Sequence, residues 1–167
     1  GGNPIDVIKS LDGKKAYVAN SQTGDVTVVD LVKGKTVDII PIGVTPTKML
    51  MSPDGELLYL TDYQMNGVRV VSTELLSLTK VLGLNNAGFE AREVPLACCL
   101  DPFNYPVAIG RGPVALTLAG DGGVIYVGNL ATRDIALIDI EKEWEVNTWD
   151  GAVGIRDMLV AGSPQKL

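Results

Sequence analysis

The chain of 167 residues contains no histidine. Histidine is the commonest general base and the commonest metal ligand in proteins, so its absence removes Ser-His-Asp triads and histidine-ligated metal or haem from within this chain. Only two cysteines are present, Cys98 and Cys99, which is too few for a zinc site of the usual ligand spacing. Neither a Gly-x-Ser-x-Gly elbow nor a glycine-rich phosphate loop occurs. The sequence therefore predicts no catalytic residues, no metal and no cofactor within these residues.

Positive charge is also scarce. Lys and Arg together number 14 against 20 Asp and Glu, which gives a net charge of −6, and the basic residues do not cluster. Nucleic-acid binding normally rests on such a cluster, so nucleic acid is not an expected partner. No run approaches 18 apolar residues, so membrane insertion through a helix is not expected. A hydrophobic content of 46% with 20% charged residues predicts a folded chain with a substantial core.

An internal repeat organises the sequence. Pro4, Pro46 and Pro113 each begin a unit in which the same residue types recur at fixed offsets. An Asp-Gly pair begins eight residues after each proline, a tyrosine lies thirteen residues after it, and an asparagine or aspartate lies sixteen residues after it. Pro4 to Pro46 is 42 residues, and Pro46 to Pro113 is 67, which is 42 plus an insertion of 25. Because several offsets recur together, the sequence predicts three related structural units.

Each unit has the pattern of four short strands separated by turn signals such as Asp12-Gly13. No segment shows sustained helical periodicity, although Thr73–Leu78 is locally ambiguous. We expect strands at Ile5–Ser10, Lys15–Asn20, Val26–Leu31 and Thr36–Pro41, at Lys48–Ser52, Leu57–Thr61, Val68–Ser72 and Leu78–Leu82, and at Ala115–Ala119, Val124–Gly128, Ile135–Ile140 and Trp144–Trp149. Four strands in a period of about 42 residues are typical of a β-propeller blade.

Five segments carry a resemblance to a known family. The turn motifs are SLDG at Ser10–Gly13 and SPDG at Ser52–Gly55, and the strand motifs are YVAN at Tyr17–Asn20, YLTD at Tyr59–Asp62 and YVGN at Tyr126–Asn129. These motifs resemble the YVTN-type β-propeller repeat. The resemblance covers everything except about residues 85–109. It implies an all-β fold, a partial β-propeller of three four-stranded blades plus the first strand of a fourth. The family includes surface-layer and extracellular binding proteins, and similar propellers occur in periplasmic redox enzymes and lactonases.

The domain boundaries follow from the register of the repeat. One partial propeller spans residues 1–167, with blade 1 at about 2–43, blade 2 at about 44–84, an insertion at about 85–109, blade 3 at about 110–151 and the start of blade 4 at about 152–167. Three blades and one strand do not close a ring of the usual size and would leave blade faces exposed. We therefore expect the remaining blades to come from a longer parent chain or from another copy of this one.

Several polar residues of the repeat are expected to have structural roles. Aspartates in tight turns accept backbone hydrogen bonds, and those at strand ends fix the turn that follows. The residues concerned are Asp12, Asp30, Asp54, Asp121, Asp139, Asn20 and Asn129.

Charged residues near the starts of the inner strands are the candidate ligand-binding residues. Inner strands of a propeller line its central channel, and ligands bind at the channel mouth. Asp6, Lys48 and Asp157 share one offset and should lie at one level around the axis. The alternative is that these charges are only solvated in a water-lined channel. The complete set is Asp6, Lys48, Arg111, Arg156 and Asp157.

The insertion is a candidate interaction loop, because loops of this length are usually functional or form an interface. Its candidate contact residues are Phe89, Cys98, Cys99, Phe103 and Tyr105. The alternative is a loop that packs on its own blade around two unreactive thiols. A bond between the adjacent cysteines would close a strained ring and would require an oxidising compartment.

Together these features favour a non-catalytic binding or interaction module, part of a larger exported protein in the periplasm or at the cell surface. Its expected partners are the remaining blades and a protein or small-molecule ligand. Two alternatives stay open. One is a fragment of a redox or lactonase-like propeller enzyme whose catalytic residues lie on other blades, and the other is a structural repeat of a surface layer.

Overall fold

The computed structural model of the chain describes residues 1–43, 45–64, 66–83, 112–142 and 144–150. Twelve strands of this part form three sheets of four strands each, and we refer to the sheets as blades 1, 2 and 3. Blade 1 contains β1 (Pro4–Lys9), β2 (Lys15–Asn20), β3 (Asp25–Asp30) and β4 (Lys35–Pro41). Blade 2 contains β5 (Pro46–Met51), β6 (Leu57–Asp62), β7 (Gly67–Ser72) and β8 (Ser77–Gly83). Blade 3 contains β9 (Pro113–Leu118), β10 (Val124–Asn129), β11 (Asp134–Asp139) and β12 (Trp144–Asp150).

Within each blade, consecutive strands pair antiparallel, so the chain runs from the first strand to the fourth as a simple meander. Every observed strand lies within two residues of its predicted bounds. The ambiguous segment Thr73–Leu78 is a turn that leads into β8, and none of the described residues is helical. The all-β prediction with three four-stranded blades is therefore confirmed. The insertion and the start of a fourth blade lie outside the described residues.

The Asp-Gly turns fix the first hairpin of each blade. In blade 1, Asp12 Oδ1 accepts hydrogen bonds from Lys14 N at 3.0 Å and from Ser10 Oγ at 2.6 Å, while Gly13 has a φ of 71°. A positive φ of this size is costly for any residue with a Cβ, which explains the glycine. Asp54 and Asp121 accept the corresponding backbone bonds, as predicted. Asp30 Oδ1 and Asp139 Oδ1 likewise accept amide hydrogens of the turns that follow them.

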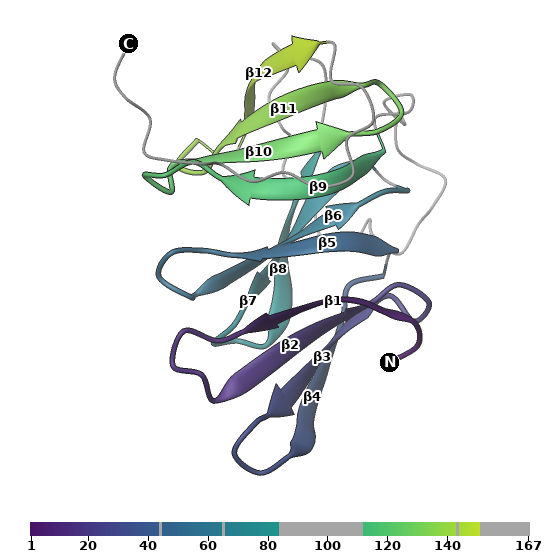
Figure 1. The fold of residues 1–167 in the computed structure, drawn as a ribbon, viewed down its shortest axis with the longest axis vertical. Helices are drawn as coiled ribbons and strands as arrows, with labels where there is room; N and C mark the ends of the chain where they lie inside the picture. The colour runs from purple at the N-terminus through teal and green to yellow at the C-terminus, as the bar shows by residue number, and fades with distance from the viewer. Residues whose placement is uncertain (44, 65, 84–111, 143, 151–167) are drawn as a thin grey trace.

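The three blades stack face to face, from the purple blade at the N-terminus to the green and yellow blade 3 (Figure 1). The inner strands β1, β5 and β9 lie next to one another in this stack. A single sheet cannot cover both of its own faces, so each blade packs its apolar side chains against those of the next blade. The three blades therefore enclose two cores, one between blades 1 and 2 and one between blades 2 and 3. The blade 1–2 core contains Tyr17, Ala19, Val26, Val28, Ile40, Ile42, Met49, Leu58, Leu60 and Val71. The blade 2–3 core contains Tyr59, Val68, Val70, Leu82, Leu116, Ile125, Val127, Ala136 and Ile138.

Candidate functional site

The structure brings together Asp6 and Lys48, two of the five residues predicted at the channel mouth. Lys48 Nζ lies 4.0 Å from Asp6 Oδ2, and the two side chains are 33% and 19% exposed. The shared offset from Pro4 and Pro46 therefore places them at one level of adjacent inner strands, as expected. The other three predicted residues, Arg111, Arg156 and Asp157, lie outside the described residues.

Asp6 also has a clear structural role. Its Oδ2 accepts a hydrogen bond from Met49 N of the next blade at 2.8 Å, and its Oδ1 accepts one from Val7 N at 3.0 Å. The carboxylate thus joins β1 to β5 across the gap between two blades. Hydrogen bonds from backbone amides stabilise a carboxylate, so a ligand of Lys48 would meet an Asp6 side chain that is already engaged.

A hydroxyl group makes the equivalent connection one blade further on. Thr47 Oγ1 lies 2.9 Å from Pro113 O, to which it donates, and 2.7 Å from Thr61 Oγ1. Asp6 and Thr47 therefore use different chemistry for the same purpose, which is to hold neighbouring inner strands in register. This second connection also shows that polar residues of the inner strands take part in blade stacking.

A buried polar cluster lies at the end of the second strand in blade 1. Asn20 Nδ2 donates to Asp25 Oδ1 at 2.6 Å and to Thr27 Oγ1 at 2.9 Å. Asn20 and Asp25 are 3% and 8% exposed. A buried polar atom without a hydrogen-bond partner destabilises the folded state. These hydrogen bonds satisfy the polar atoms of Asn20 and Asp25, so Asn20 has a structural role here.

Blades 2 and 3 change this cluster. In blade 2 the equivalent positions hold Asp62 and Arg69, whose side chains form an ion pair with Nη2 2.8 Å from Oδ2. In blade 3, Asn129 Nδ2 donates to Asp134 Oδ1 at 2.6 Å, and Ala136 stands at the position of Arg69. Among the described residues, Asn129 Oδ1 is the one buried side-chain polar atom that has no hydrogen-bond partner.

Sequence reasoning missed the ion pair between Asp62 and Arg69. The available signal was a correlated change within the repeat. Where blade 1 has Asn20 and Thr27, blade 2 has an acid and a base at the same two offsets. A buried charge normally requires a partner, so the simultaneous appearance of both charges indicates that they pair.

A tyrosine of β2 connects blade 1 to the turn that follows β7 in blade 2. Burial raises the pKa of Tyr17 above its ordinary value of 10.0, and a hydrogen bond with the Thr73 side chain partly offsets this effect. The hydroxyl group is thus kept neutral and satisfied at the edge of the blade 1–2 core. Thr73 itself also bonds through Oγ1 to Gly55 O at 2.8 Å.

The remaining site predictions concern the insertion. Phe89, Cys98, Cys99, Phe103 and Tyr105 lie outside the described residues, so their proposed role as an interaction loop stays a prediction. In the part of the chain that the structure describes, no group of three or more histidine, cysteine or acidic side chains could hold a metal ion. The same residues include no helix long and apolar enough to span a membrane.

Comparison with known proteins identifies the architecture. No protein-family model matches the chain, and no curated protein sequence matches it. Among solved structures, the chain is similar to hydrazine synthase of Kuenenia stuttgartiensis, with a TM-score of 0.72 and 21% sequence identity. The match covers 93% of this chain and 38% of that chain, so this chain spans well under half the length of that relative. With the three stacked four-stranded sheets, this similarity shows that the chain has the fold of a partial β-propeller.

Proposed function

We propose that the chain is a non-catalytic binding module of the YVTN type, which contributes consecutive blades to a larger propeller. The observation that carries this proposal is the uncovered face of blade 1, which we call the open face. One row of side chains crosses this face from β1 to β4, because Val7 pairs with Val18, Val18 with Thr27 and Thr27 with Ile39. Val7 is 62% exposed and Ile39 is 52% exposed.

The same positions are buried in the other two blades. Met49 and Leu116 hold the place of Val7 in blades 2 and 3, and each is 3% exposed. Leu60 and Val127 hold the place of Val18, and each is 0% exposed. In both cases the preceding blade supplies the cover. An apolar face of this kind is typical of an interface rather than of a free surface.

The expected occupant of the open face is a further blade of the same repeat. The preceding blade in each existing interface presents a tyrosine at offset thirteen, Tyr17 or Tyr59, beside valines of its third strand. A blade with that pattern would cover Val7 and Val18 as blade 1 covers Met49 and Leu60. Burial of an aliphatic side chain stabilises by about 1.5–3 kcal/mol, so a few such residues supply substantial association energy.

Light scattering tests this proposal. At increasing concentration, the isolated chain should associate into species larger than 17.7 kDa through its open face. Val7→Lys should weaken the association at least several-fold without lowering thermal stability, since this side chain is largely exposed. Leu75→Lys is the matched control, because Leu75 is 70% exposed in the turn between β7 and β8 and lies away from the open face. A stable, well-folded monomer of the unmodified chain would contradict the proposal.

We also place this module in the periplasm or at the cell surface, as in the extracellular members of the family that it resembles. In that location the insertion, with Phe89, Phe103 and Tyr105, would contact a protein or small-molecule partner. A Cys98–Cys99 disulfide would form only where oxidation is permitted. Titration of thiols in the non-reduced protein should find none, and two free thiols would remove this support.

A further inference from the structure

Five of the nine lysines in this acidic chain gather at one end of blade 1. Two turns form this end, the turn between β1 and β2 and the turn between β3 and β4. They lie side by side, because Leu31 N of the second turn donates a hydrogen bond to Lys14 O of the first at 2.8 Å. Figure 1 shows both turns at the end of blade 1 that lies away from the N-terminus. We call this end the basic tip, and its lysines are Lys9, Lys14, Lys15, Lys33 and Lys35.

Most of this positive charge is not neutralised within the chain. The two turns contain two acids, Asp12 and Asp30, whose Oδ2 atoms lie 3.8 Å from Lys14 Nζ and 3.3 Å from Lys33 Nζ. Ion pairs as exposed as these contribute little to stability. Within the described ranges of the chain, the other three lysines form no ion pair. The basic tip therefore has an excess of positive charge, although the whole chain has a net charge of −6.

The equivalent ends of the other two blades have the opposite charge. Blade 2 has Asp54, Glu56 and Glu74 in its two turns and no basic residue there. In the corresponding turns of blade 3, acids also outnumber bases, and Lys142 is the single base. The positive charge at this end of the molecule is thus a property of blade 1 and not of the repeat.

Two exposed aliphatic side chains stand among the lysines. Val32 is 75% exposed and Leu11 is 66% exposed. The turn that presents Val32 is fixed by Asp30, whose Oδ1 accepts hydrogen bonds from Val32 N and Lys33 N, each at 2.9 Å. The basic tip therefore offers apolar side chains and cationic groups together, which suits a partner that is both anionic and apolar.

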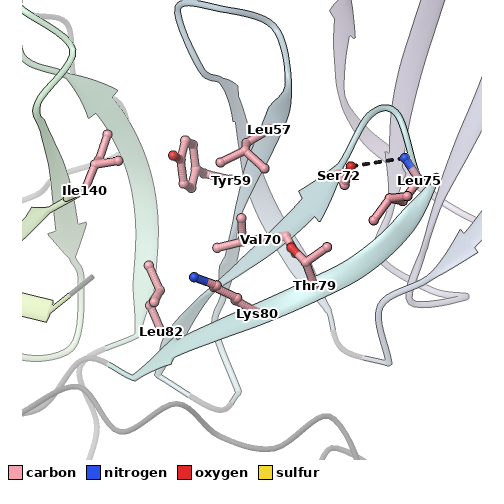
Figure 2. Close-up of a pocket in the computed structure, with 9 residues that line it drawn as sticks. All are labelled: Leu57, Tyr59, Val70, Ser72, Leu75, Thr79, Lys80, Leu82 and Ile140. Atoms are coloured by element: carbon pink, nitrogen blue, oxygen red, sulfur yellow. Dashed lines mark hydrogen bonds between the residues drawn. The ribbon is translucent and has the colours of Figure 1, made fainter. Parts of the chain in front are cut away.

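This end of a blade stays exposed when another blade packs against it. Blade 2 is covered by blade 1, yet Leu75 in the turn between β7 and β8 is 70% exposed. Figure 2 shows this turn, in which Leu75 N donates a hydrogen bond to Ser72 Oγ at 3.1 Å. Pro53 and Glu74, which hold the places of Leu11 and Val32 in blade 2, are exposed as well. A blade on the open face would therefore leave the basic tip free.

From this arrangement we infer that the basic tip binds the surface of a membrane that contains anionic phospholipids. The lysine ammonium groups would lie at the lipid phosphates, and Val32 and Leu11 would enter the outermost apolar layer. Lysine acts as a point charge and is attracted to an anionic bilayer without a shaped partner. Protein interfaces are instead enriched in aromatic residues, methionine and arginine and are depleted of lysine. The two turns of the basic tip contain none of those enriched residues.

Flotation with lipid vesicles tests the charge of the site. The chain should bind vesicles of phosphatidylcholine that contain about 30% phosphatidylglycerol, and should bind pure phosphatidylcholine at least about tenfold more weakly. Added salt should weaken the binding, because it screens the lysines. Lys9→Gln/Lys15→Gln/Lys35→Gln should weaken it about 100-fold, since each lysine contributes about fivefold. Lys142→Gln removes a lysine from an acidic turn of blade 3 and should leave binding unchanged.

A second pair of variants tests the apolar contact. Val32→Ser should weaken binding to the anionic vesicles several-fold, because binding strength scales with the apolar area that enters the bilayer. Leu130→Ser is the control, since Leu130 is 44% exposed in the turn between β10 and β11, at the opposite end of the blades. Circular dichroism establishes that each variant folds.

Four results would overturn the inference. These are an absence of binding to anionic vesicles, undiminished binding by the folded triple lysine variant, a loss in Lys142→Gln as large as in the triple variant, and a loss in Val32→Ser no greater than in Leu130→Ser. Polyglutamate serves as the probe for a protein partner. Binding to polyglutamate without binding to vesicles would assign the basic tip to an acidic polypeptide and not to a membrane.

Discussion

Arg69 donates two hydrogen bonds to a single carboxylate oxygen of Asp62, from Nε at 3.0 Å and from Nη2 at 2.8 Å. The side chains are 2% and 0% exposed, so the pair is buried within the stack of blades. Each charge is tolerated there because the other compensates it. Removal of one partner leaves an uncompensated buried charge, which costs far more than the pair contributes.

We predict that Arg69→Met lowers the free energy of unfolding by about 3–5 kcal/mol, because Asp62 is then buried without its cation. Asp62→Asn should have an effect of similar size, since it removes the charge that compensates Arg69. The double variant Asp62→Asn/Arg69→Thr has the residue types that blade 1 has at the equivalent positions, Asn20 and Thr27, and should recover part of the lost stability. Urea denaturation of all four proteins gives the coupling energy. If the loss of stability in the double variant equals the sum of the two single losses, the two side chains do not stabilise each other and the prediction is wrong.

Tyr17→Phe should destabilise the protein by about 1 kcal/mol through loss of the hydrogen bond with Thr73. Thr73→Val is expected to cost more, because it also removes the hydrogen bond to Gly55 O, and the double variant should cost less than the sum of the two single effects. The pKa of Tyr17 is raised in the folded state, so its contribution is fully present below pH 10.0 and is lost as the pH rises above that value. Unfolding measured in alkaline buffers should therefore show a smaller loss of stability in Tyr17→Phe than in the unmodified protein.

Acid should weaken the hairpins. Hydrogen bonds from Ser10 and from the Lys14 amide lower the pKa of Asp12, and those from Ser52 and the Glu56 amide lower the pKa of Asp54. A carboxylate with a lowered folded pKa contributes stability that is present above its ordinary value of 3.8 and is lost as the pH falls through the folded pKa. The free energy of unfolding should therefore fall as the pH drops below about 4. Asp12→Asn/Asp54→Asn should show a shallower fall, and an unchanged slope would be evidence against this cause.

Gly122 lies in a turn where two blades approach closely. A Cβ atom at this position would lie 2.7 Å from Pro53 Cγ of blade 2, and the φ of Gly122 is 75°. Gly34 has a similar φ of 64° and no neighbouring atom within 4 Å, so it serves as the matched control. Gly34→Ala should cost about 1 kcal/mol for its backbone conformation, and Gly122→Ala about 1–3 kcal/mol more, because the proline ring cannot rotate away. Thermal denaturation measures both, and Pro53→Ser should remove the difference.

The bounds of the strands were predictable because the features that fix them are local. Asp12-Gly13 determines a tight turn by its own backbone geometry and side-chain bonds, and the same pair recurs in each unit. The common level of Asp6 and Lys48 was also predictable, because equal offsets in adjacent repeats place residues side by side, although the ion pair between them was not predicted. The bond from Met49 N to Asp6 was not, because it depends on how far one blade slides along the next.

The features that the sequence concealed arise between blades. Arg69 stands between two valines, a pattern in which the basic side chain is expected to face solvent. The neighbouring blade instead buries it, and Arg69 is 2% exposed. Packing between repeats thus decides what the pattern within one repeat leaves open.

The buried polar pair differs in each blade: Asn20 with Asp25, Asp62 with Arg69, and Asn129 with Asp134. This difference limits which strands can be exchanged between blades. A hybrid that joined the second strand of blade 2 to the third strand of blade 1 would place the carboxylates of Asp62 and Asp25 together in a buried site. The reverse hybrid would leave Arg69 beside Asn20, with no anion to neutralise it. Strands from different blades are therefore not interchangeable, although their turns and apolar positions match. The unit that duplication and exchange can transmit intact is the whole blade, since only the whole blade carries both members of its buried pair.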